Sequence, residues 1–110
     1  MTLETRVVGR VAVIQVHGKM TGVTGEVRSA AIDAMSNGCS TVVVNIQDVP
    51  AIDSSGVGEF VSTSTSLRNR GGRLKVCNPS AKIESLFAIT KLNTMLDIYK
   101  TEAEAIASAT

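Results

Sequence analysis

The sequence predicts an α/β protein formed by one domain, residues 1–110, with a mixed, mostly parallel sheet of about five strands and about four helices. Three observations lead to this fold class. Short β-branched runs alternate with segments whose apolar residues recur at helical spacing. The run Val42-Val43-Val44 is apolar without alternation, which is typical of a strand covered on both faces. The order of elements, β β α β α β α β α, predicts right-handed βαβ units after an initial hairpin.

The first two strands are predicted at residues 3–8, where the pattern is weak, and at 11–16, where a β-branched run is clear. Gly9-Arg10 between them predicts the turn of a β-hairpin. Residues 17–22 are glycine-containing and polar, so we expect a loop there.

The first helix follows that loop. Thr21 is a candidate N-cap, and Asn37-Gly38 predicts an end in a left-handed turn. Glu26, Arg28 and Asp33 lie off the apolar face. The apolar positions at helical spacing are Val23, Val27, Ala30, Ala31, Ala34 and Met35.

The centre of the chain predicts a strand at 39–46, broken by Asp48-Val49-Pro50. The next helix is expected to begin at or near Asp53-Ser54 and to stop at Gly71-Gly72. The residues predicted on its inner face are Val57, Phe60, Val61, Ser64 and Leu67.

In the last third, residues 73–77 alternate as a strand with one polar side, and Asn78-Pro79-Ser80 precedes a helix. A short strand is expected at 96–99. Thr101 and Glu104 have the spacing of a capping box at the start of the last helix. The apolar positions are Ile83, Leu86, Phe87 and later Leu92 in the third helix, and Ala103, Ile106 and Ala107 in the last.

The junction Asp53-Ser54-Ser55-Gly56 is the candidate functional site. In the structural interpretation, Asp53 or Ser54 caps the helix, and Gly56 and Gly58 permit close packing. In the functional interpretation, the site lies where α/β domains usually bind ligands, at the end of a strand that leads into a helix. A helix N-terminus also tolerates negative charge, because its N–H groups and dipole favour anions.

Composition excludes several classes of function. The formal net charge is +1, so no overall field attracts nucleic acid or an anionic membrane. No apolar run approaches the roughly 20 residues of a membrane span, and the N-terminus lacks the pattern of a signal peptide. Cys39 and Cys77 have no disulfide or zinc spacing and are expected to be free, buried thiols. We therefore expect a cytoplasmic protein with no metal and no cofactor.

Other polar clusters have simpler explanations. The hydroxyl-rich run 62–66 is expected to be a solvated helix face with small packing residues, with a phosphorylation site as the alternative. The basic residues Arg68, Arg70, Arg73 and Lys75 lack the aromatic residues of a nucleic-acid surface and are expected to line a solvated edge. His17 is the only histidine, and nothing in the pattern brings it to Ser54 and Asp53 as a hydrolase triad.

The segment 42–58, a hydrophobic strand followed by Asp48 and then Asp53-Ser54-Ser55-Gly56-Val57-Gly58, resembles the signature of STAS domains, the anti-sigma factor antagonist family. The similarity continues through Gly71-Gly72, Asn78-Pro79 and the later apolar positions. Residues 13–18 match the strand before the family's first helix. The resemblance covers nearly the whole chain and implies a single STAS-like domain that acts by binding and is not an enzyme.

The resemblance implies a phosphorylation switch at Ser54, with Ser55 as the alternative acceptor. In the family, the unphosphorylated protein binds a partner that is both anti-sigma factor and serine kinase, and so releases a sigma factor for transcription. Phosphorylation blocks that binding and a serine phosphatase reverses it, with no direct contact to nucleic acid or membrane. We expect a monomer or a weak dimer. The implied partner-binding residues are Met20, Thr21, Asp53, Ser54, Ser55, Gly56, Val57 and Gly58.

The chain departs from the family pattern at one place, and two alternative functions remain open. Many sensor-type members carry an acidic residue in the first loop, where this chain has Lys19-Met20-Thr21. That difference leaves the identity of the partner open. The alternatives are a non-phosphorylated scaffold or subunit of a larger signalling or transport assembly, and a module that binds a small ligand or nucleotide at the same turn.

Overall fold

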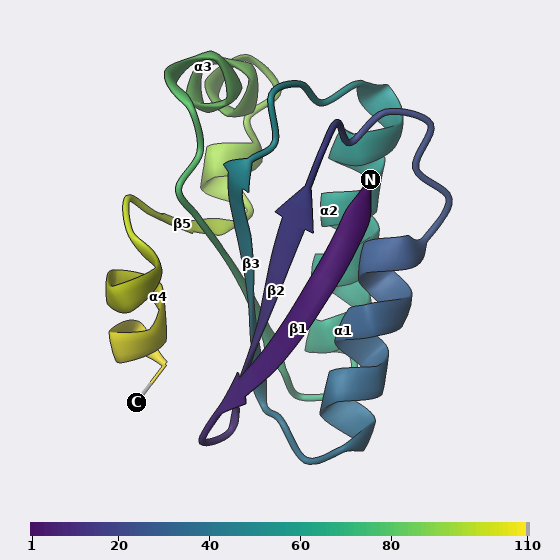
Figure 1. The fold of residues 1–110 in the computed structure, drawn as a ribbon, viewed down its shortest axis with the longest axis vertical. Coiled ribbons are helices and arrows are strands. Elements are labelled where there is room, and N and C mark those ends of the chain that lie inside the picture. Colours follow the sequence, from purple (N-terminus) through teal and green to yellow (C-terminus); the bar gives the residue numbers. More distant parts are fainter. Residues whose placement is uncertain (110) are drawn as a thin grey trace.

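The computed structural model describes residues 1–109. It contains one five-stranded sheet in the order β1-β2-β3-β4-β5, so spatial order follows chain order (Figure 1). β1 and β2 are antiparallel and the other neighbours are parallel, which confirms the mixed, mostly parallel sheet. The strands are β1 Thr2–Val8, β2 Val11–His17, β3 Thr41–Asp48, β4 Arg73–Cys77 and β5 Asp97–Tyr99. The helices are α1 Glu26–Ser36, α2 Ser54–Arg68, α3 Ala81–Ile89, the 3-10 turn η1 Leu92–Thr94 and α4 Glu102–Ser108.

The helices cover the sheet unequally. α1 and α2 lie against one face, whereas α4 lies on the other (Figure 1). On the first side, Val42 and Val44 of β3 join a large core that includes Phe60 of α2. On the other side, Val43 joins a small cluster with Ala105 of α4. All three valines are fully buried, which confirms that the central strand is covered on both faces.

The ends of α1 differ from each other. Thr21 does not cap this helix, contrary to the sequence prediction, because α1 begins only at Glu26 after Gly25 in the left-handed region (φ 103°). At the other end, Gly38 has φ 101° and its N–H donates to the Met35 carbonyl (3.0 Å). The predicted left-handed end is therefore confirmed. Gly71, with φ 78°, likewise lies at the turn after α2.

Several inward faces differ from the ideal helical pattern. In α2 the buried residues include Thr63, which was not expected on the inner face, whereas Ser64 is only half-buried. Leu92 is buried, but it lies in η1 beyond the end of α3. In α4 the prediction for Ala103 and Ala107 is wrong, because both are exposed and Ala105 is the buried residue. The full buried sets are Gly56, Glu59, Phe60, Thr63 and Leu67 in α2, and Ala105 alone in α4.

Side chains cap the last two helices, and of these two caps the sequence predicted Thr101. Ser80 caps α3 by accepting from the Ile83 N–H (3.2 Å), and Thr101 caps α4 by accepting from the Glu104 N–H (3.2 Å). Cys39 and Cys77 are free and buried, as predicted. Burial raises the pKa of the Cys77 thiol to about 12, so this side chain behaves as a small apolar residue.

Candidate functional site

Two loops run side by side where β2 and β3 end. The Met20 N–H donates to the Ala51 carbonyl (2.9 Å), and the Asp53 N–H donates to the Met20 carbonyl (3.3 Å). Met20 and Ile52 form an isolated parallel bridge. The pairing of β2 with β3 is thus continued beyond the sheet, and it fixes the loop that carries Asp53 against the loop that precedes α1.

Asp53 is the N-cap of α2 and organises the junction. Its Oδ1 accepts from the Ser55 N–H (2.9 Å) and the Gly56 N–H (3.2 Å), and its Oδ2 accepts from the Gly22 N–H (3.1 Å). The hydrogen bond from the Ser55 hydroxyl is the main reason why the pKa of the Asp53 carboxyl lies below its ordinary value, and these backbone N–H groups add to the effect. The carboxylate is therefore ionised at neutral pH and binds both loops.

The two serines of the junction have different environments. Ser55 is half-buried: its hydroxyl donates to Asp53 (2.5 Å) and accepts from the Val23 N–H (2.9 Å). On an ideal helix Ser55 would point outward, but here its hydroxyl is held by these two contacts. Ser54, the first residue of α2, is exposed, and within the described residues its hydroxyl has no hydrogen-bond partner. Of the two hydroxyls, only that of Ser54 is free to react without breaking a contact.

The two glycines of the junction also have different roles. A Cβ on Gly56 would lie 2.6 Å from both the Ile52 Cγ2 atom and the Met20 carbonyl oxygen, so the close contact of the loops requires glycine here. A Cβ on Gly58 would meet nothing within 4 Å, and that residue is exposed. Gly56 therefore permits packing within the chain, whereas Gly58 leaves open surface.

The remaining predicted partner contacts divide by burial. Met20 is fully buried, so the expectation that its side chain faces a partner is not met in this structure. Val57 is half-buried and packs against the core. Thr21 and Asp53 are exposed. The accessible part of the junction is accordingly formed by Thr21, Asp53, Ser54 and Gly58.

An apolar groove adjoins the junction. It has a volume of about 290 Å³ and lies between Ala51 and Ile52 of the loop and Ile83, Leu86 and Ile89 of α3. The Ile89 side chain is 80% exposed, the largest exposure of any bulky apolar residue in the described chain. Ile52 is two positions before Ser54, so the groove is bordered by the loop that leads into the serine.

Glu59 supports the site structurally in a way that the sequence pattern did not indicate. It is buried in α2, and its Oε2 accepts from the N–H groups of Val27 (2.9 Å) and Arg28 (3.1 Å). These are N–H groups of the first turn of α1, which has no capping side chain of its own. Helix α2 therefore caps its neighbour. Only the presence of a carboxylate on the inner half of α2 could have indicated such a role.

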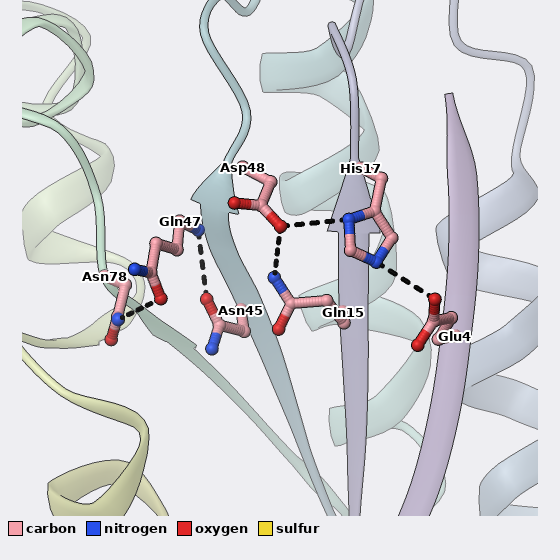
Figure 2. A network of polar contacts seen from close by, with 7 residues as sticks. All are labelled: Glu4, Gln15, His17, Asn45, Gln47, Asp48 and Asn78. Atoms are coloured by element: carbon pink, nitrogen blue, oxygen red, sulfur yellow. Dashed lines mark hydrogen bonds and ion pairs between the residues drawn. The ribbon is translucent and has the colours of Figure 1, made fainter.

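His17 belongs to a separate polar network on the sheet. Its Nδ1 lies 2.9 Å from Asp48 and its Nε2 3.3 Å from Glu4. Both contacts are drawn as dashed lines in Figure 2. Asp53, in contrast, contacts Ser55, Gly56 and Gly22. The structure does not join His17, Asp53 and Ser54 into a hydrolase triad. The other members of the network are Gln15, Asn45, Gln47 and Asn78.

The hydroxyl-rich and basic runs are mostly engaged within the chain. Thr63 is fully buried, which removes it as an accessible phosphorylation site. Ser62 accepts from Arg28 (2.9 Å) and Ser64 from Arg68 (3.3 Å). Lys75 does not lie on the predicted solvated basic edge, because it is buried and donates to the Tyr99 hydroxyl (3.2 Å). Only Arg68, Arg70 and Arg73 are exposed there.

The model of the STAS domain family matches residues 2–105. The chain belongs to the STAS family. Two named relatives agree. A putative anti-sigma factor antagonist of Thermotoga maritima is 29% identical over 72 residues, which are 66% of this chain and 64% of that protein. The anti-sigma-B factor antagonist of Bacillus subtilis is 42% identical over 53 residues, 48% of this chain and 49% of the relative. The matched regions thus span about half to two thirds of these relatives.

Solved structures agree with this STAS assignment over the whole fold. The anti-sigma factor antagonist SpoIIAA in its unphosphorylated form superposes with a TM-score of 0.80 at 26% identity, covering 98% of this chain and 96% of SpoIIAA. The Bacillus cell fate determinant SpoIIAA in its phosphorylated form superposes with a TM-score of 0.74 at 25% identity, covering 99% of this chain and 100% of SpoIIAA. No described helix of the STAS chain has the length and apolar character needed to cross a membrane.

Proposed function

We propose that this chain is an anti-sigma factor antagonist that is switched off by phosphorylation of Ser54. It binds an anti-sigma factor that is also a serine kinase, has no catalytic activity of its own, and is returned to its active form by a serine phosphatase. The observation that carries the proposal is the state of the two serines. Ser54 presents a free, exposed hydroxyl at the start of α2, whereas the Ser55 hydroxyl is held by Asp53 and the Val23 N–H.

The charge at the junction supports a switch that needs no refolding. A phosphoserine carries about −1.5 to −2 charges at pH 7. On Ser54 that charge would stand beside the Asp53 carboxylate, which already occupies the N–H groups of Ser55 and Gly56. The phosphate would therefore remain at the surface as a new negative patch. The backbone of the two loops can stay as it is while the electrostatic character of the surface changes.

The partner surface follows from the same neighbourhood. The apolar groove between residues 51–52 and α3, with the exposed Ile89, supplies the hydrophobic part of a binding surface. Thr21, Asp53 and Gly58 supply the polar rim around Ser54. Binding of a partner would have to remove water from a phosphate added at that rim, which costs free energy, and the phosphate would repel acidic groups of the partner. Both effects weaken binding of the phosphorylated form.

The test is phosphorylation by a candidate serine kinase of the anti-sigma factor type. With ATP, mass spectrometry should locate one phosphate on Ser54, the Ser54→Ala variant should incorporate none, and the Ser55→Ala variant should still react. Calorimetry with the same kinase should show that Ser54→Asp weakens binding at least tenfold, or about 1.4 kcal/mol. Phosphate that persists in Ser54→Ala would refute the acceptor. No phosphate, together with binding that Ser54→Asp leaves unchanged, would favour a constitutive scaffold.

A further inference from the structure

The outer edge of β1 is a strand edge without a partner in the described chain. β1 is the first strand of the sheet order and pairs on one side only, with β2. It is seven residues long, it contains no proline, and its register with β2 is continuous from Thr2 to Val8. Six of its residues are exposed and Leu3 is half-buried. A long, regular, uncovered edge is a template for pairing with another strand, and proteins usually block such edges.

The hairpin determines which backbone groups face outward. Val8 and Val11 flank the two-residue turn Gly9-Arg10, so they form a directly hydrogen-bonded pair. Because hydrogen-bonded and non-hydrogen-bonded pairs alternate along an antiparallel ladder, every second residue of β1 is turned toward β2. The residues left with outward N–H and C=O groups are Leu3, Thr5 and Val7.

These outward groups restrict how a second copy could pair with β1. In an antiparallel ladder, outward residues must stand opposite outward residues. The register that overlaps the whole strand with itself is then symmetric about Thr5, with Leu3 opposite Val7 of the second copy. This arrangement forms about six backbone hydrogen bonds.

The same register brings opposite charges together. It places Glu4 opposite Arg6 of the second copy, and the twofold symmetry repeats this pair. Both side chains lie on the α4 side of the sheet, where Arg6 contacts Glu102 (2.8 Å) and Glu4 contacts His17 (3.3 Å). Both are well exposed, at 54% and 78%, and a guanidinium has donors for a second carboxylate. The strand is therefore complementary to itself in charge as well as in hydrogen bonding.

The opposite side of the strand is apolar and hollowed. Val7 is 61% exposed. It borders a groove of about 250 Å³ between β1 and Ala30 and Ala34 of α1. In the symmetric register, Leu3 of the second copy stands beside Val7 at this groove, on the same face of the sheet.

We propose that the edge of β1 is a self-association surface. Two copies pair β1 with β1, antiparallel and symmetric about Thr5, and form one continuous sheet in which Glu4 of each copy faces Arg6 of the other. The interface is small, so the dimer is expected to be weak, with a Kd on the order of 10–100 µM.

Charge reversal with a compensating swap tests the pairing. In sedimentation velocity over a concentration series, Arg6→Glu and Glu4→Arg should each weaken the dimer at least tenfold, because each places like charges opposite one another. The double variant Glu4→Arg/Arg6→Glu should restore it. The double variant still lacks the Arg6–Glu102 contact, so recovery could not come from repair of the monomer. A wild type that stays monomeric in the millimolar range, or a double variant as weak as the singles, would overturn the proposal.

Cross-linking tests the register separately. Cα atoms of a directly hydrogen-bonded pair are about 5.5 Å apart, within disulfide range. Under mild oxidation, Thr5→Cys should therefore yield a covalent dimer. Val7→Cys is the matched control. In the symmetric register Val7 stands opposite Leu3 of the second copy, so the two introduced cysteine side chains would not face each other and should not cross-link. The native Cys39 and Cys77 are buried and should not contribute. Equal cross-linking of both variants would contradict the symmetric register.

Discussion

The first turn of α1 lies against the second turn of α2, and the free N–H groups at the starts of the two helices are satisfied in different ways. In α2 the cap is local and exposed: Asp53 directly precedes the helix and accepts from Ser55 and Gly56. In α1 the cap is remote and buried: Glu59 of α2 accepts from Val27 and Arg28. The remote cap fixes the two helices to each other, whereas the local cap leaves the start of α2 at the surface, where Ser54 is accessible.

The largest effect is expected from removing the remote cap. Glu59→Ala leaves two N–H groups at the start of α1 without an acceptor in a part of the chain that water reaches poorly. Loss of a charged acceptor from two such donors should lower the free energy of unfolding by about 3 kcal/mol, measured by urea denaturation. Glu59→Gln keeps an acceptor oxygen of similar shape and should lose less. Equal stability of Glu59→Ala and wild type would show that the capping of α1 is dispensable.

A smaller effect is expected where α2 contacts the loop before α1. Gly56→Ala places a methyl group 2.6 Å from the Met20 carbonyl oxygen and from Ile52, so the loops must separate. The loss should be about 2 kcal/mol, the ordinary range for overpacking. Gly58→Ala, two residues further in the same helix, meets open space and should stabilise by up to about 1 kcal/mol. Thermal unfolding of both variants should give shifts of opposite sign; shifts of the same sign would contradict the packing role of Gly56.

The fold was predictable because its signals are local. Strand runs, the glycine turns at Gly38 and Gly71, and the Thr101 cap each depend on residues close in sequence, and the structure confirms them. The inner face of α4 was misassigned, because a helix of seven residues is too short for periodicity to select Ala105 over its neighbours.

The candidate site was predictable only in part. The pattern located the junction and its Asp53, but it could not show that the Ser55 hydroxyl is engaged while that of Ser54 is free, because ideal helix angles do not hold in a first turn. The half-burial of Ser55 depends on the Val23 N–H, which comes from a different loop. Glu59 was missed for the same physical reason: its hydrogen bond joins residues 32 positions apart, and no local pattern encodes that distance.

The last and smallest effect concerns acidity at the local cap. The hydrogen bond from Ser55 lowers the pKa of Asp53 below its value of 3.8 in an unstructured chain. Folding therefore favours the ionised form, so this contribution to stability is complete above that value and is lost as pH falls through the lower pKa of the folded state. Asp53→Asn can still accept at the cap but cannot titrate.

The stability difference between wild type and Asp53→Asn should accordingly be largest near neutral pH and should shrink below about pH 4. The pKa of Glu26, at the start of α1, is also lowered, chiefly because its carboxylate accepts from the Thr24 N–H (2.6 Å). Glu26→Gln is therefore the control: it should show the same shrinkage without affecting the Ser54 junction. A difference that stays constant from about pH 6 to pH 2.5 would mean that the Asp53 charge does not contribute to the cap, and that its geometry alone holds the two loops together.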